Sequence, residues 1–321
     1  MENFVYLCDE RNKPKMMDKL FFELIRVSTG QLDCLSRGAE PEEWQELYQL
    51  AHQHQLVGVC YRGAQALFEF GLRVPHELII DWMAEAEQIE EQNALLTQRC
   101  IEVQQLLLTK NFKSSVLMGQ GVARDYNESL QMLRQPDGTT ALLVTGDKAG
   151  VQALLDTWDD EEIQLHDSIE TSKNPYRKWV LDRWFEKNDK ALFVKDGEMV
   201  RPSASMNLIF QLIRLHRLFL YQGITLRDLM DFFFALKRVA GHGRTSTINY
   251  EKVIKSLGLL GFSRGVIWVM QEVFGLGEEE QIVKPLESQG TFILHEVMAG
   301  RHRFFRLAMK HPVEMLCSLL P

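Results

Sequence analysis

Two short glycine segments have the residue types that let a backbone approach a phosphate group. Gly119-Gln120-Gly121 follows a short apolar run, and Gly138 precedes Thr139 and a second apolar run, 141–144. Glycine adopts positive φ without steric cost and lets other groups come close to its backbone. The same residues also form ordinary tight turns, and for Gly119-Gln120-Gly121 taken alone a turn is the commoner explanation. Both a turn and a phosphate-binding segment therefore stay open.

Arg227 has two roles to be weighed in the same way. Its planar guanidinium is suited to binding a phosphate with two hydrogen bonds. Asp231 follows four residues later on the same predicted helix, close enough for the two side chains to pair. A local ion pair or a bridge between helices is the commoner outcome at this spacing, and phosphate binding by Arg227 remains the alternative.

The glycine segments resemble the core of a bacterial nucleotidyltransferase family, common in Bacteroidetes-type genomes. In that family one strand ends in a Leu-Lys-Gly-Gln-Gly turn, and a second strand reads Gly-Asp-Ile-Asp followed by apolar residues. This chain keeps the glycines but has Met118 at the lysine position, and Thr139 and Ala141 at the two aspartate positions. The resemblance implies a nucleotide-binding cleft at Gly119, Gln120, Gly121, Gly138, Thr139 and Arg227.

Further segments extend this resemblance over most of residues 40 to 300. Residues 44–51 and 56–59 look like the family's N-terminal helical region, and residues 266–274 are also similar. Residues 223–231 resemble a Gly-x-x-Leu-Arg-x-x-x-Asp segment that ends at Asp231. The family has a Glu-x-His pattern on a later strand, where this chain has Gln164 and His166. The resemblance thus leaves His166 and Asp231 as candidates for a residual polar site.

The substitutions bear directly on metal chemistry. Nucleotidyl transfer uses one or two Mg²⁺ ions to neutralise the triphosphate, and Mg²⁺ prefers carboxylate ligands. Thr139 and Ala141 would share one face of a strand, and neither supplies a negative charge. We therefore predict no metal ligands and no assigned cofactor; Mg²⁺ would bind only if relocated carboxylates converged within roughly 4–6 Å of one another beside the glycine turn. The nearest acids are Asp125, Asp137, Asp147 and Asp167.

Composition indicates a soluble globular protein. The 321 residues are 45% hydrophobic and 25% charged, and the net charge of -8 argues against strong attraction to nucleic acid or to anionic membranes. The five cysteines are widely spaced and form no Cys-x-x-Cys, which predicts reduced thiols. The sequence has neither a secretory signal nor an apolar run of the roughly 18 residues that span a bilayer. We expect a cytoplasmic protein with no membrane partner.

The hydrophobic pattern predicts an α+β fold that is mostly helical, with a small mixed sheet in the middle. Residues 1–110 are expected to form an N-terminal helical region, including a helix over 76–109 whose apolar stripe contains Ile89, Leu95, Leu96, Val103 and Leu106. Residues 111–202 are expected to form a reduced nucleotidyltransferase-like α/β core. Its predicted elements are strands at 114–118, 141–144 and 163–166, a helix over 122–134, and a hairpin turn at Asp196-Gly197. Residues 203–321 are expected to form a C-terminal helical bundle.

Three other groups of residues have weaker claims to chemistry. His295-Glu296 begins like a zinc-binding His-Glu-x-x-His helix, but Ala299 replaces the second histidine. His52 and His54 lie two residues apart on a predicted helix, so they face different directions and are expected to be surface polar residues. The basic segment 301–311, with two phenylalanines, suits a solvated helix face more than stacking on nucleic acid.

These observations favour a divergent nucleotidyltransferase-family protein that lacks metal-dependent nucleotidyl transfer, in effect a pseudoenzyme. It would act as a nucleotide-binding or partner-binding module. Two alternatives stay open: an active nucleotidyltransferase that uses relocated carboxylates, and a structural or regulatory scaffold for protein interactions. The expected partners are a nucleotide or another protein, and nucleic acid is not expected.

Overall fold

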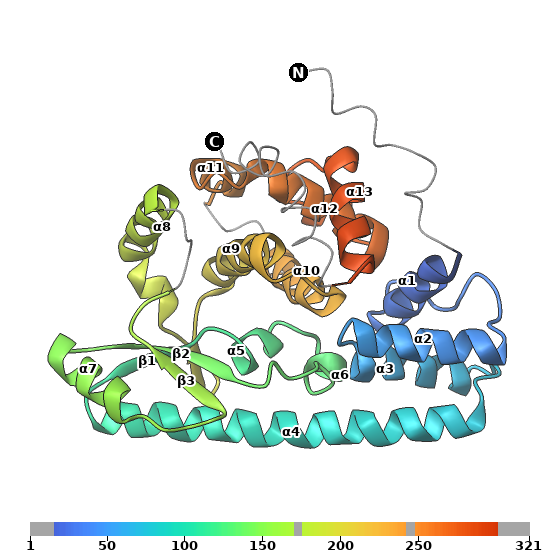
Figure 1. Cartoon of the computed structure of the whole chain (residues 1–321), viewed down its shortest axis with the longest axis horizontal. Coiled ribbons are helices and arrows are strands. Elements are labelled where there is room, and N and C mark those ends of the chain that lie inside the picture. The colour runs from blue at the N-terminus through green and yellow to red at the C-terminus, as the bar shows by residue number, and fades with distance from the viewer. Residues whose placement is uncertain (1–15, 170–174, 242–247, 301–321) are drawn as a thin grey trace.

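The computed structural model describes residues 16–169, 175–241 and 248–300 (Figure 1). Its helices and strands, in chain order, are α1 (Met16–Ser28), α2 (Pro41–Gln53), α3 (Val57–Glu69), α4 (His76–Thr109), β1 (Lys113–Val116), α5 (Gln120–Ala123), α6 (Glu128–Gln131), β2 (Thr140–Thr145), α7 (Lys148–Thr157), β3 (Ile163–His166), α8 (Pro175–Lys187), a 3₁₀ turn (Asp189–Leu192), β4 (Val194–Asp196), β5 (Met199–Arg201), α9 (Ala204–Tyr221), α10 (Leu226–Gly241), α11 (Tyr250–Ser256), α12 (Leu260–Phe274), a second 3₁₀ turn (Glu278–Glu280) and α13 (Glu287–Met298). Helices dominate around a small mixed sheet, so the predicted α+β class is confirmed. Within the described ranges, the helices are too short or too polar to span a bilayer.

The 34-residue helix α4 runs beneath both the N-terminal helices and the sheet (Figure 1). Its first half buries Trp82 in a large hydrophobic cluster that also contains residues of α1–α3 and α9–α13. Its second half buries Cys100 and Leu107 in another cluster, which contains residues of the three-stranded sheet and α7. One helix therefore positions the sheet relative to the helical parts of the molecule.

The inner face of α4 is partly polar, so the predicted apolar stripe is right at Ile89 and Val103, which are buried, and wrong at two other positions. Leu95 and Leu106 are 72% and 44% exposed. Asn93 and Gln104 are buried instead, because their side-chain amides donate to backbone carbonyls of the neighbouring loop and strands. Inward-facing polar side chains are stable where such hydrogen bonds satisfy them.

The strands lie in the order β1-β2-β3, with β1 antiparallel and β3 parallel to β2. One face of this sheet packs against α4 and α7 through apolar residues that include Leu142, Val144 and Leu165. The three predicted strands and the β4–β5 hairpin are confirmed. The helix predicted over 122–134 is wrong: two four-residue helices, α5 and α6, take its place. Asn127 begins the second of them, because its side chain accepts a hydrogen bond from the Leu130 amide at 3.1 Å.

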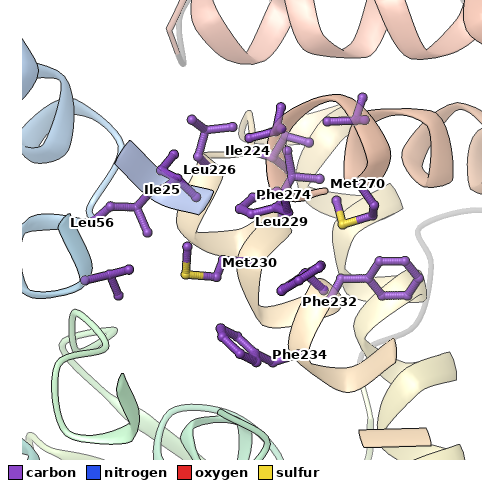
Figure 2. Packing of buried hydrophobic residues seen from close by; sticks show 14 of the residues in the cluster. Ile25, Leu56, Ile224, Leu226, Leu229, Met230, Phe232, Phe234, Met270 and Phe274 are labelled. Carbon is purple, nitrogen blue, oxygen red and sulfur yellow. The ribbon is translucent and has the colours of Figure 1, made fainter. Parts of the chain in front are cut away.

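Helix α10 lies at the centre of the C-terminal helices. Every residue from Leu226 to Leu236 is buried. Figure 2 shows Leu229 and Met230 of this helix among apolar side chains that include Ile25 of α1 and Phe274 of α12. A helix enclosed in this way must find partners inside the protein for its charged side chains.

Candidate functional site

The glycine segment makes a tight connection between β1 and the short helix α5. Gly119 has φ +63°, and a Cβ at this position would lie 2.5 Å from the Thr140 hydroxyl oxygen. A Cβ at Gly121 would overlap the carbonyl oxygen of Val116. Gly138 lies on the exposed loop before β2, has φ +84°, and has open space around it. Close packing therefore excludes a larger residue at Gly119 and Gly121, whether or not a ligand binds here.

Gln120, the residue between the two glycines, turns inward toward α4. Its side chain is 3% exposed. The amide nitrogen donates to Asn93 Oδ1 at 2.8 Å, and the amide oxygen accepts from the Thr97 hydroxyl at 3.0 Å. These bonds fix the turn on the long helix, and they leave the Gln120 amide facing protein groups.

The positions at which the resemblance expects acidic residues come together in the sheet. In the parallel register of β2 and β3, Ala141 lies opposite Gln164. Thr139 precedes the first residue of β2 and is half-buried. His166 follows Gln164 on the same face, opposite Leu143. The register thus brings Ala141 and Gln164 together, and neither side chain carries a charge.

This face of the sheet is closed over β2 and open over β3. Ala141 and Leu143 are buried, whereas Gln164 and His166 are exposed. Leu143 belongs to the same hydrophobic cluster as Leu181 of α8 and Leu192 of the turn that follows it. A polar ligand would therefore approach from the β3 side.

Next to this face, a buried ion pair joins α10 to the loop that leads into β2. Asp231 is fully buried, and Arg134 is 1% exposed. The guanidinium of Arg134 donates from Nε to Asp231 Oδ1 at 2.7 Å and from Nη2 to Oδ2 at 2.8 Å. The Tyr126 hydroxyl also donates to Asp231, at 2.8 Å. Asp231, predicted as a residual polar site, thus has three hydrogen bonds from protein groups.

Arg227 pairs with Asp137 at 2.5 Å and with Asp228 at 3.0 Å, rather than with Asp231 as its helical spacing predicted. Arg214 of α9 completes the cluster, at 3.2 to 3.9 Å from the same three aspartates. With Arg134, three arginines face three aspartates, so the charges balance. The buried guanidinium of Arg227 is bonded to carboxylates, which favours the ion-pair role over phosphate binding.

Comparison with known proteins gives one match, in the first half of the chain. Residues 40–134 match the model of a family described as an uncharacterised nucleotidyltransferase. The matched range runs from the start of α2 through the Gly119 turn to Arg134, and it ends before β2. Searches of curated proteins and of solved structures gave no match. The match supports a nucleotidyltransferase-like nature for this chain.

A second ion-pair cluster fastens the glycine turn to the β4–β5 hairpin. Asp125 lies 2.8 Å from Arg201 and 3.3 Å from Arg238, and both arginines also reach Asp196 of β4, at 2.6 and 3.0 Å. Burial raises the pKa of Asp125, although the two arginines act in the opposite direction. Arg201 also donates to the Gly121 carbonyl at 2.9 Å. This cluster holds the end of α5 in place.

The four acids nearest the turn have separate surroundings. Asp125 and Asp137 each face arginines. Asp147 caps α7 by accepting from the Gly150 amide at 3.0 Å, and Asp167 is exposed beyond the end of β3. In the part of the chain that the structure describes, no group of three or more His, Cys, Asp or Glu residues is placed to hold a metal ion. A cation at Asp125 or Asp137 would have to displace arginines.

Two of the weaker sequence candidates can also be placed. His52 is exposed and lies 3.2 Å from Glu85. His54 is 2% exposed and lies beside the ring of Phe21, so its prediction as a surface residue is wrong. Burial lowers the pKa of His54 to about 4, which keeps the imidazole neutral. The basic segment 301–311 lies outside the described residues.

Sequence reasoning missed Tyr126, Arg134 and Arg201, which hold the two ion-pair clusters together. Their partners lie 76 to 105 positions away in the chain. The sequence of α10 did indicate buried ion pairs, because Arg227, Asp228 and Asp231 interrupt an otherwise apolar run. Charged residues in a buried helix require buried partners of opposite charge.

Acid is expected to destabilise the protein through Asp137 and Asp228. Burial raises the pKa of Asp137, but Arg134, Arg227 and Arg214 outweigh it and hold this pKa well below its usual value. Arg214 and Arg227 likewise outweigh burial at Asp228 and lower its pKa. These carboxylates therefore stabilise the fold above an unfolded-state pKa of about 3.9. That contribution is lost as the pH falls through their folded-state pKa values.

Urea denaturation at a series of pH values between about 5 and 2 measures this loss. Asp125, whose pKa is raised, acts in the opposite direction, so a variant is needed to isolate one group. Asp137→Asn is expected to be less stable than the wild type at pH 7 and to lose less stability on acidification. Asp159→Asn, at an exposed position, is the control and should follow the wild type. Equal acid slopes for Asp137→Asn and the wild type would contradict the prediction.

Proposed function

We propose that this nucleotidyltransferase-like protein binds a nucleotide without catalysing metal-dependent nucleotidyl transfer. One observation carries the proposal: Ala141 and Gln164 lie opposite each other in the sheet, Thr139 precedes them, and all three are uncharged. Two-metal transfer requires negative oxygen ligands at such positions to hold Mg²⁺ against the triphosphate. A hydroxyl, a methyl group and an amide do not supply that charge.

The carboxylates that remain nearby are poor replacements. Asp125 and Asp137 are both buried in arginine clusters. Removing one partner from a buried ion pair costs about 3–5 kcal/mol, so recruiting either acid to a metal would destabilise the fold. This cost supports the binding module over the alternative of an active transferase with relocated carboxylates.

The nucleotide would lie on the open, β3 side of the face. Gly138, Gln164 and His166 are exposed, and Thr139 is half-buried. Together they offer a backbone amide, a hydroxyl, a side-chain amide and an imidazole for hydrogen bonds. Gln120, whose amide is bonded to α4, supports the turn in this proposal and does not contact the ligand.

Isothermal titration calorimetry with ATP, GTP, CTP and UTP, each with and without Mg²⁺ or Mn²⁺, tests this function. We expect weak binding that neither metal changes, and a loss of about tenfold in affinity for His166→Ala, since one such hydrogen bond contributes about 1.5 kcal/mol. His76→Ala, exposed at the far end of α4, is the matched control. Metal-dependent binding would instead support an active transferase, and no binding of any nucleotide would support a protein-interaction scaffold.

A charge-restoring variant sharpens the metal part of this test. Thr139→Asp combined with Gln164→Glu introduces two carboxylates at positions that are not buried. Nucleotide binding by this double variant is expected to become stronger when Mg²⁺ is added, whereas binding by the wild type is not. If Mg²⁺ strengthened nucleotide binding equally in both proteins, the wild type would already hold a metal.

A further inference from the structure

A polar pocket of about 260 Å³ lies on the N-terminal side of the molecule, away from the sheet face. It is bounded by the end of α2, the turn into α3, the middle of α4 and the loop that follows Arg134. Its lining residues are His52, Gln55, Val57, Glu85, Gln88, Ile89, Gln92, Gln135 and Pro136. None of these residues belongs to the nucleotide site proposed above, so the pocket does not depend on that function.

Hydrogen bonds and a His–Glu contact within the protein fix the walls of the pocket before any ligand binds. Glu85 accepts from the Tyr48 hydroxyl and lies 3.2 Å from His52. On the opposite side, the Gln135 carbonyl accepts from Arg134 at 3.3 Å and from Arg227 at 3.2 Å. The side chain of Gln135 therefore projects from a fixed backbone. Preformed walls lower the ordering cost of binding.

Gln55 is unusual in two respects. Its φ is +59°, and Asn111 is the other non-glycine residue with positive φ in the described ranges. Its side-chain oxygen is buried and has no hydrogen-bond partner. The positive φ ends helix α2, because the Gln55 and Leu56 amides donate to the carbonyls of His52 and Ala51 at 3.1 and 2.8 Å, a common helix C-terminus. The side-chain oxygen is shielded from solvent, so Gln55 forms part of the pocket wall and is not a group that recognises the ligand.

The lining defines the chemistry of the ligand. The amides of Gln88, Gln92 and Gln135 supply paired donors and acceptors. Val57, Ile89 and Pro136 supply apolar surface. The lining contains no lysine or arginine, so it does not favour a phosphate. Its single carboxylate, on Glu85, is already bonded, so it does not favour a cation.

A nucleobase meets these requirements. It is neutral and flat, and its edges carry alternating donors and acceptors that glutamine amides bind in pairs. The pocket is smaller than the roughly 300–1,000 Å³ typical of drug-sized ligands, which suits a base or a nucleoside. We propose that this pocket binds the base of a nucleoside, with Gln88, Gln92 and Gln135 as the groups that recognise it.

Calorimetry with adenosine, guanosine, cytidine and uridine, and with their 5′-monophosphates, tests the proposal. At least one nucleoside is expected to bind saturably, and its monophosphate should bind no better. Gln88→Leu and Gln92→Leu change exposed side chains, so both variants should fold. Each is expected to weaken binding by about tenfold or more, the effect of one paired amide contact.

Gln98→Leu is the matched control, because Gln98 is exposed on the same helix and donates to Glu102 outside the pocket. His166→Ala should leave nucleoside binding unchanged, which separates this pocket from the nucleotide site. The proposal is overturned if no nucleoside binds, or if Gln88→Leu and Gln92→Leu both bind as tightly as Gln98→Leu. Loss of nucleoside binding in His166→Ala would also overturn it, by assigning the nucleoside to the sheet face.

Discussion

Asp231→Ala is expected to lower the free energy of unfolding by about 3–5 kcal/mol, the cost of removing one partner from a buried ion pair. The substitution removes the two hydrogen bonds that the buried guanidinium of Arg134 donates to Asp231, and it also removes the acceptor of the Tyr126 hydroxyl. Urea denaturation at pH 7, followed by circular dichroism, measures the change.

Two further variants separate the ion pair from a general effect of substitution. Glu102→Ala removes an exposed carboxylate 3.9 Å from Arg99, and its expected cost is below about 0.5 kcal/mol. The double change Arg134→Met with Asp231→Leu removes both charges, so it should recover much of the stability lost by Asp231→Ala. A loss of less than about 1 kcal/mol for Asp231→Ala would show that the pair does not hold α10 to the loop.

The ion pair joins two segments that lie far apart in the chain. The matched region ends at Arg134, and the Leu-Arg-x-x-x-Asp segment ends at Asp231. These two side chains form one bidentate contact in the fold. Helix α10 therefore holds the start of the loop that leads to Thr139.

Elements with a recognisable apolar pattern could be predicted from the sequence, whereas the irregular segment between β1 and β2 could not. Helix α4 and the three strands have hydrophobic periods that a local window can show. The segment from Gly119 to Arg134 has similar composition to a helix, but it is divided by Asn127, which caps α6, and by Asp125, which turns inward to Arg201. Neither the Asn127 cap nor the Asp125–Arg201 pair can be read from the spacing of apolar residues alone.

The same distinction holds for the site. The alternation of strand side chains predicted that Thr139 and Ala141 share a face, and the parallel register places Gln164 beside Ala141. The roles of Gln120 and Arg227 could not be predicted in this way. Gln120 bonds to a helix more than 20 positions away in the chain, and the three arginines that face Asp137 come from three separate segments. Short motifs specify local geometry, whereas the partners of a buried polar group depend on the whole fold.

Gly121→Ala is expected to destabilise the protein by about 3 kcal/mol, at the upper end of the range for overpacking. The added methyl group would overlap the carbonyl oxygen of Val116, and this backbone cannot move freely because β1 is paired with β2. The Gly121 carbonyl also accepts from Arg201, so a shift of the turn would disturb the Asp125 cluster. Thermal and urea denaturation of the variant measure the loss.

Gly138→Ala separates crowding at the turn from the general cost of replacing a glycine. Gly138 has φ +84° but open space around it, so alanine there should cost only the backbone strain of about 1–2 kcal/mol. Stability measured beside nucleotide affinity then distinguishes the two interpretations of the glycine segment. A large loss of stability in Gly121→Ala identifies this glycine as a packing requirement of the fold. Unchanged stability with weakened nucleotide binding would instead mean that the glycine is there to let a ligand approach the backbone.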